Sequence, residues 1–213
     1  MLDHTDHDLL WDGLLTATRE AYAASAALSA FSPFAGDIRR QPVTPFHVAA
    51  AALFAAEAGL YTDSLAALRD AFRSCAPLAQ WRETYKETDI GQDFMDRFGC
   101  YCLIGEGGAF ASDTMAAWLV YMPPHLYYPW HQHPAEEMYL VVAGEALFLR
   151  HGEAPEVLRP GQTSAHASNQ PHAMQTFDHP VMALVVWRNG FDSPPVLTPK
   201  DVPTALCKAS LQA

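Results

Sequence analysis

Long apolar runs and basic residues are scarce in this sequence, and each scarcity excludes a class of protein. The longest apolar candidate, residues 48–60, is rich in alanine and interrupted by Glu57, so it is too short to span a bilayer. The 13 basic residues face 24 acidic ones, which gives a net charge of −11. Because such a surface repels phosphate backbones and anionic lipid, we expect neither nucleic acid nor a membrane as a partner.

Cysteine is also rare, and the few thiols do not form a recognisable site. Cys100 and Cys102 stand two residues apart, which is not the C-x-x-C spacing of zinc and redox motifs. No second pair completes a metal site, so we expect Cys75, Cys100, Cys102 and Cys207 to be reduced thiols packed in the protein. The N-terminus is acidic where a secretory leader is basic, which leads us to expect a cytoplasmic protein.

The first part of the chain has helical periodicity. Apolar residues recur at helical spacing across residues 8–31, and a second helix is expected to begin at Thr44-Pro45. Shorter helices are expected over residues 64–72 and 79–88. Residues 1–95 are therefore expected to form a helical N-terminal region, and none of its side chains is predicted to take part in chemistry.

Short strand-like runs separated by turns follow from about residue 99. The predicted strands cover residues 100–104, 116–122, 137–142, 146–151, 173–177 and 181–187. Many short strands at regular spacing favour an antiparallel sandwich or barrel. We expect an α+β protein with its β-barrel at residues 96–195 and a proline-rich C-terminal tail at residues 196–213.

Histidines concentrate in the strand-rich part, where seven of the ten lie within residues 125–179. On a strand, His131 and His133 project from the same face, so both imidazoles can reach one ion. Glu137 begins the next strand and can offer an oxygen from the facing side, whereas alternation directs its rival Glu136 toward solvent. Imidazole and carboxylate ligands together suit Fe, Zn, Mn, Co or Ni.

These residues resemble a known sequence motif. His131-x-His133-x-x-x-Glu137, with Gly144 further along, is similar to the first motif of the cupin family. His125 stands where that family usually has a glycine. The resemblance covers residues 116–188 and implies a jelly-roll barrel that binds a metal.

The second cupin motif is matched more loosely, by Gly161, Asn169, Pro171 and His172. Asn169 replaces a glycine that is usual in the family. His172 stands at the position of the fourth metal ligand, and His166, which also lies nearby, falls outside the register of the motif. The resemblance therefore implies one divalent transition metal ion bound by His131, His133, Glu137 and His172.

The aromatic residues around the first motif indicate which group of cupins the sequence resembles. The pattern H-x-H-x-x-x-E-x-Y, with a preceding Tyr-Tyr pair and a helical N-terminal region, resembles the cupin-type dimethylsulfoniopropionate lyases. The resemblance implies that Tyr139 is the general base, that Tyr128 contributes to the site, and that Trp187 faces the sulfonium of the substrate. Tyr127 and Trp130 are further candidates for an aromatic cage around that cation.

The implied activity is a metal-dependent lyase acting on a small zwitterion. Removal of the proton alpha to the carboxylate by a tyrosine, followed by beta-elimination, would yield dimethyl sulfide and acrylate. Two alternatives stay open: a mononuclear iron cupin dioxygenase acting on a small thiol or carboxylic acid, and a non-catalytic cupin that binds a small molecule. The dioxygenase interpretation leaves Tyr139 without a role. The apolar N-terminal helices are compatible with a homodimer.

Overall fold

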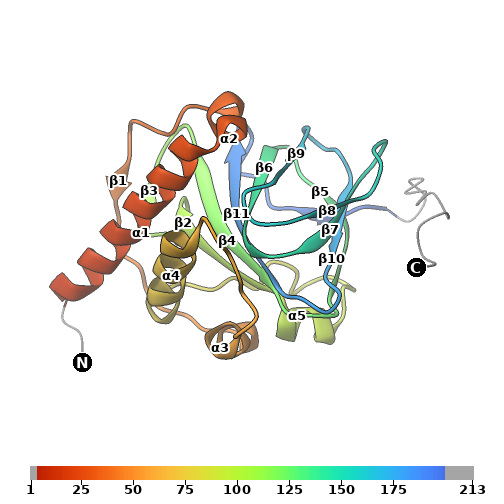
Figure 1. Cartoon of the computed structure of the whole chain (residues 1–213), viewed down its shortest axis with the longest axis horizontal. Helices are drawn as coiled ribbons and strands as arrows, with labels where there is room; N and C mark the ends of the chain where they lie inside the picture. Colours follow the sequence, from red (N-terminus) through yellow and green to blue (C-terminus); the bar gives the residue numbers. More distant parts are fainter. Residues whose placement is uncertain (1–3, 200–213) are drawn as a thin grey trace.

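The computed structural model describes residues 4–199 and places the described helices in the N-terminal half of the chain (Figure 1). In chain order they are α1 (His4–Ala24), α2 (Ala26–Phe31), α3 (Ala49–Ala56), α4 (Ala66–Cys75), a 3-10 turn (Ala76–Leu78) and α5 (Gln92–Arg97). Every helix within residues 4–199 is too short or too polar to span a bilayer.

The strands form two sheets. The seven-stranded sheet has the order β1 (Arg39–Arg40), β3 (Phe110–Ala111), β2 (Gly99–Ile104), β4 (Ala116–Met122), β11 (Val181–Arg188), β6 (Glu136–Gly144) and β9 (Thr163–His166). The five-stranded sheet has the order β12 (Val196–Leu197), β5 (Tyr127–Gln132), β10 (His172–Gln175), β7 (Ala146–Arg150) and β8 (Glu156–Leu158). The pairings are antiparallel except for the short contact between β2 and β3. The molecule is thus an α+β protein with a helical layer and a cupin barrel.

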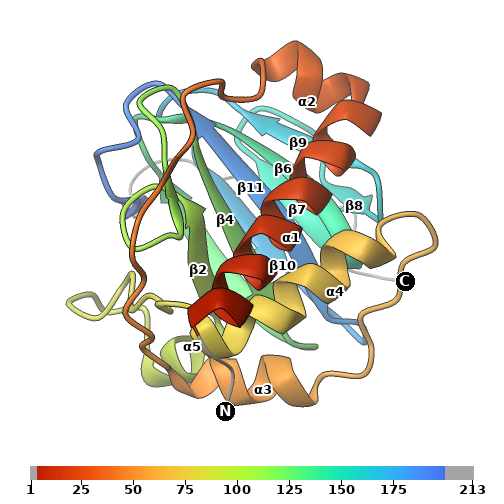
Figure 2. The ribbon, with the colours of Figure 1, turned by 90° about the vertical axis from the view of Figure 1, so that its left-hand side faces the viewer.

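Alternation along the central strands divides the apolar residues between two cores. On β4, Trp118 and Val120 point into the barrel, whereas Leu119 and Tyr121 point toward the helices. The helices α1 and α4 lie over this outer face of the seven-stranded sheet, and α3 lies at one end of it, close to α5 (Figure 2). Because both faces of the sheet are covered, β4 is buried along its whole length and reads as a continuous apolar run.

The expected helix over residues 8–31 is in fact two helices. Ser25 ends the first and begins the second, because its hydroxyl accepts a hydrogen bond from the backbone N–H of Leu28 and caps α2. The helix expected from Thr44 begins later, at Ala49, because Phe46 is held in an extended bridge with Gln80.

The helix expected over residues 79–88 is absent, and that expectation was wrong. Trp81 forms a bridge with Tyr101 of β2, and the backbone N–H of Arg82 donates to the carbonyl of Cys100. The Trp81 ring is buried, and its indole N–H donates to the carbonyl of Ala76. These tertiary contacts hold the segment extended and outweigh its local helical propensity.

Three turn positions of the cupin motifs require unusual backbone conformations. His125 and Asn169, which replace family glycines, both have φ of 57°, in the left-handed region that glycine adopts without cost. Gly144 has φ of 71°, and a Cβ there would lie 1.8 Å from the carbonyl oxygen of Pro180. Only glycine fits at position 144, which explains why the first motif has a glycine there.

The expected boundaries of the barrel do not separate the elements in space. β1, from the N-terminal region, pairs with β3, and β12, from the expected tail, pairs with β5. The rest of that tail, residues 200–213, lies outside the described residues, and so does Cys207. The other three cysteines, Cys75, Cys100 and Cys102, are free and buried, as expected.

Candidate active site

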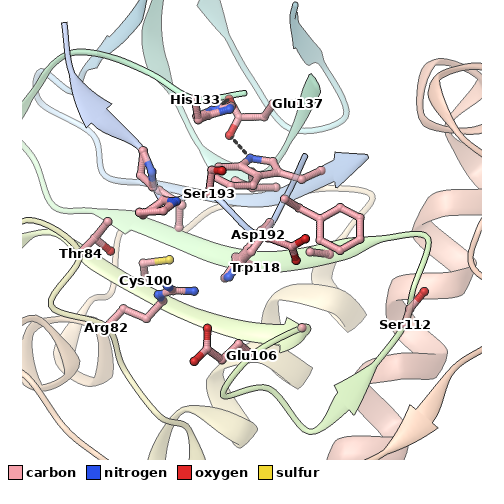
Figure 3. A pocket seen from close by; sticks show the side chains of 18 of the residues that line it. Arg82, Thr84, Cys100, Glu106, Ser112, Trp118, His133, Glu137, Asp192 and Ser193 are labelled. Carbon is pink, nitrogen blue, oxygen red and sulfur yellow. Dashed lines mark hydrogen bonds and ion pairs between the residues drawn. The ribbon is translucent and has the colours of Figure 1, made fainter. Parts of the chain in front are cut away.

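A cavity of about 430 Å³ lies between the two sheets, and most of the predicted site residues line it. His133 and Glu137 are labelled among them in Figure 3. Its lining includes His131, His133, Glu137, Tyr128, Tyr139 and Trp187. Trp118, Cys100 and Arg82 also line it, and none of these was predicted from the sequence to be a site residue. A volume of this size suits one small molecule.

A bulge in β5 decides which of its side chains enter the cavity. His131 pairs with His172 of β10, whereas Tyr128 pairs with Met174, so two residues of β5 between these pairs oppose a single residue of β10. The extra residue brings Tyr128 and His131 to the same buried face. The Tyr128 ring consequently stacks on the His131 ring, with centroids 3.9 Å apart.

The three histidines of the motifs share one hydrogen-bond arrangement. Each Nδ1 lies against a backbone carbonyl two residues away, at 2.9 Å for His131, 3.0 Å for His133 and 2.8 Å for His172. A carbonyl only accepts, so each Nδ1 carries the proton and each Nε2 keeps a free lone pair. This tautomer is the one that a metal-binding imidazole needs.

The free nitrogens of His133 and His172 converge on one carboxylate oxygen of Glu137. Oε2 of Glu137 lies 3.1 Å from Nε2 of His172 and 3.4 Å from Nε2 of His133, yet neither nitrogen makes a hydrogen bond within the described residues. These three ligand atoms lie within 4.8 Å of one another. Orphaned buried nitrogens around a carboxylate fit a divalent transition metal.

His131 lies beside this group rather than inside it. Its ring centroid is 4.0 Å from that of His172 and 6.4 Å from that of His133. Burial, and then the neighbouring His172, lowers the pKa of His131 well below its usual value. His131 is therefore neutral at physiological pH and lines the cavity on the side of Tyr128.

The charges of the site are balanced locally. Burial disfavours the charged form of Glu137, but His133 and His172 outweigh burial and lower the pKa of that carboxyl well below its usual value. Burial likewise opposes protonation of His133, yet Glu137 raises the pKa of His133. Glu137 is consequently an ionised carboxylate inside the barrel, in the form required of a metal ligand.

The two rival residues occupy different places. Glu136 points away from the barrel interior and forms an ion pair with Arg188 at 2.9 Å. His166 is buried, but its Nδ1 lies 2.6 Å from Oε2 of Glu137 and its Nε2 lies 3.0 Å from the hydroxyl of Ser164. Both nitrogens of His166 thus have partners within the protein, unlike those of His133 and His172.

Tyr139 offers a free hydroxyl to the cavity. It follows Glu137 on β6 with the same inward parity, and its hydroxyl makes no hydrogen bond with another described residue. Burial, and then the charge of Glu137, raises the pKa of Tyr139 well above its usual value. Without a nearby cation Tyr139 is therefore a phenol, because neither burial nor a neighbouring carboxylate favours tyrosinate.

Tyr128 has a buried partner that sequence analysis did not identify. Its hydroxyl lies 2.7 Å from the hydroxyl of Tyr85, which belongs to the loop before α5. Burial raises the pKa of both phenols, so both stay protonated. The N-terminal region, expected to take no part in the chemistry, thus supports the cavity wall through Tyr85. Tyr85 lies outside every motif, so no signal in the sequence pointed to it.

The predicted aromatic residues divide into two groups. Trp187 lines the cavity, and its ring lies 4.7 Å from Trp118 and 4.1 Å from His133. Its indole N–H donates to Oε1 of Glu137 at 2.7 Å. Tyr127 and Trp130 are not among the cavity-lining residues, and Tyr127 is 41% exposed. The bulge in β5 turns Tyr127 outward, whereas Trp130 faces away from the cavity because it is next to the inward-facing His131. Trp118, on β4, lines the cavity instead.

Comparisons with known sequences indicate the family to which this chain belongs. Residues 18–183 match the model of the dimethylsulfoniopropionate lyase family. The chain is 50% identical to dimethylsulfoniopropionate lyase DddQ of Ruegeria pomeroyi DSS-3 over 194 residues, which cover 91% of this chain and 96% of the relative.

Comparison with solved structures indicates the same family. The crystal structure of Ruegeria pomeroyi DddQ superposes with a TM-score of 0.88 at 50% identity, covering 90% of this chain and 97% of that one. A chain from the crystal structures of the lyases RdDddP and RnDddQII superposes with a TM-score of 0.85 at 34% identity, covering 91% of this chain and 100% of that one. This chain therefore belongs to the dimethylsulfoniopropionate lyase family of carbon–sulfur lyases.

Proposed function

We propose that this chain is a metal-dependent lyase that cleaves dimethylsulfoniopropionate into dimethyl sulfide and acrylate. The observation that carries the proposal is that the free Tyr139 hydroxyl lines the same cavity as His133 and Glu137, which form one donor set with His172. Family membership and 50% identity to a lyase of this specificity support the substrate.

His133, Glu137 and His172 would hold the metal, with His131 as the fourth ligand from the adjoining position. Their Nδ1–H groups are tied to backbone carbonyls, so the imidazole rings are already oriented. A divalent ion bound there supplies Lewis acidity toward the substrate carboxylate and favours the tyrosinate form of a nearby tyrosine.

The tryptophan faces suit the other end of the zwitterion. A dimethylsulfonium has no hydrogen to donate, so an aromatic face is its natural partner, as it is for quaternary ammonium ions. Trp187 and Trp118 line the cavity together, 4.7 Å apart at an interplanar angle of 63°. Both rings belong to the seven-stranded sheet, which also carries Tyr139, so sulfonium and base lie on one wall.

Tyr139 then acts as the base of a beta-elimination. Its phenolate oxygen takes the proton from the carbon alpha to the carboxylate. The C–H electron pair becomes the new carbon–carbon double bond, and the bond between sulfur and the beta carbon breaks with its pair leaving on sulfur. The products are neutral dimethyl sulfide and the acrylate anion, and Tyr139 returns its proton to solvent. No oxidant or reductant is needed.

Headspace gas chromatography of dimethyl sulfide tests the proposal. Purified protein is incubated with dimethylsulfoniopropionate as isolated, after chelation, and after re-addition of Fe, Mn, Zn, Co or Ni in turn. We expect release in proportion to protein, loss on chelation, and recovery with at least one ion. No release with any ion contradicts the proposed substrate, and dioxygen uptake in the same vessel would instead favour an oxygenase.

A further inference from the structure

The carboxylate of Glu137 is held at both of its oxygens by residues outside the predicted ligand set. The indole N–H of Trp187 donates to Oε1 at 2.7 Å, and Nδ1 of His166 donates to Oε2 at 2.6 Å. All three residues are buried, with exposures of 2% for Glu137, 3% for His166 and 7% for Trp187. At these distances, and shielded from water, both are strong charge-assisted hydrogen bonds.

Sheet register places the two donors on opposite sides of Glu137. β6 lies between β11 and β9 in the seven-stranded sheet. Glu137 is directly opposite Trp187 on β11 and directly opposite His166 on β9. Residues opposite one another project from the same face of a sheet, so all three side chains enter the barrel side by side.

A third residue fixes the orientation of the His166 ring. A carboxylate only accepts hydrogen bonds, so Nδ1 of His166 carries the proton. The other nitrogen, Nε2, is then an acceptor, and the hydroxyl of Ser164 donates to it at 3.0 Å. Ser164 lies two residues before His166 on β9, on the same buried face. The hydrogen bonds therefore run in one direction, from Ser164 through His166 to Glu137.

We propose that Trp187, His166 and Ser164 are positioning residues that hold Glu137 in the orientation in which it binds the metal. Oε2 of Glu137 faces Nε2 of His133 and of His172. The terminal torsion of a glutamate is soft, so a carboxylate held at neither oxygen would sample other orientations. This inference rests on the metal site of the proposed function. It gives Trp187 a second role, the positioning of Glu137, in addition to the contact of its aromatic face with the sulfonium.

Substitutions that keep a ring but remove a donor test the role of Trp187. Trp187→Phe preserves an aromatic face and leaves Oε1 of Glu137 without its donor. Trp118→Phe is the matched control, because Trp118 lines the same cavity but makes no hydrogen bond to Glu137. We expect Trp187→Phe to weaken metal binding by about 10- to 100-fold, the usual effect of losing a group that orients a ligand. Trp118→Phe should leave metal affinity unchanged.

His166 provides a second, independent pair of variants. His166→Leu removes the donor to Oε2, whereas His166→Asn keeps an N–H donor near the position of Nδ1. We expect His166→Leu to lose metal affinity about as strongly as Trp187→Phe, and His166→Asn to recover part of that loss. Ser164→Ala should have a smaller effect, because Nδ1–H of His166 can still donate to Glu137 when only the hydroxyl that orients the ring is removed.

The measurement is the affinity of metal-free protein for Zn²⁺, determined by competition with a chromophoric chelator, with thermal unfolding of each metal-free variant as a control for folding. Weaker binding by Trp187→Phe and His166→Leu, with normal binding by Trp118→Phe, supports the inference. Equal affinity in wild type, Trp187→Phe and His166→Leu overturns it and leaves the proposed function intact. Wild-type protein that binds no divalent ion contradicts the metal site itself and, with it, the proposed function.

Discussion

Replacement of Tyr139 by phenylalanine should lower turnover by orders of magnitude without disturbing the fold. The hydroxyl of Tyr139 faces the cavity and bonds to no other described residue, so its removal leaves no buried partner unsatisfied. The ring keeps its edge contact with Phe148, whose centroid is 5.5 Å away. We therefore expect the free energy of unfolding to change by less than about 1 kcal/mol.

The catalytic loss should be much larger than this structural effect. Removal of a general base typically lowers the rate about 10²- to 10⁴-fold, which corresponds to roughly 3 to 5 kcal/mol of barrier height. Because Tyr139 is not among the proposed metal ligands, Zn²⁺ affinity should stay at the wild-type value. The assay is the rate of dimethyl sulfide release at saturating substrate, with metal content measured on the same sample.

Tyr128→Phe is an informative comparison, because it removes a hydroxyl of the same cavity that does have a partner. Its loss leaves the Tyr85 hydroxyl buried and unpaired, so stability should fall along with activity. A Tyr139→Phe protein that binds metal normally and releases dimethyl sulfide at more than about a tenth of the wild-type rate would refute the base assignment.

Three further predictions concern stability and reactivity. Gly144→Ala should lower the thermal unfolding midpoint by several degrees or prevent folding, because its Cβ would lie 1.8 Å from the carbonyl oxygen of Pro180; a wild-type midpoint would contradict this. Tyr85→Phe should cost about 1–3 kcal/mol in chemical denaturation by stranding the Tyr128 hydroxyl, and an unchanged denaturation midpoint would count against the buried pair. Burial raises the pKa of Cys100 to about 11, so its thiol should stay protonated at neutral pH and resist alkylation by acrylate, the electrophilic product of the proposed reaction. Peptide mass spectrometry after iodoacetamide treatment across pH should show alkylation rising toward pH 11, and a midpoint near the unperturbed value of about 8.5 would contradict it.

The part of the site that strand alternation controls could be predicted from the sequence. Glu137 and Tyr139 share inward parity on β6, so a period of two was sufficient to place them on one face, whereas Trp187 on β11 was assigned through the family resemblance. The same alternation turned Glu136 outward to Arg188. These predictions depend only on local backbone geometry, which neighbouring residues in the chain determine.

The part that depends on long-range pairing could not be predicted in this way. The bulge that brings Tyr128 inward is visible only in the register between β5 and β10. The contact of His166 with Glu137 needs the pairing of β6 with β9, and Tyr85 reaches the barrel because the preceding extended segment docks at Trp81. Pairings between residues distant in sequence leave no periodic signal in either partner.

The central claim is that a metal-loaded site eliminates dimethyl sulfide from the substrate, and the two products measured together test it most directly. Proton NMR of dimethylsulfoniopropionate incubated with metal-loaded and with chelated protein reports the acrylate vinyl signals and dimethyl sulfide in one spectrum. We predict acrylate and dimethyl sulfide in equal amounts from the loaded protein and neither from the chelated protein. Turnover that is unaffected by chelation, or dimethyl sulfide without an equal amount of acrylate, would contradict the account.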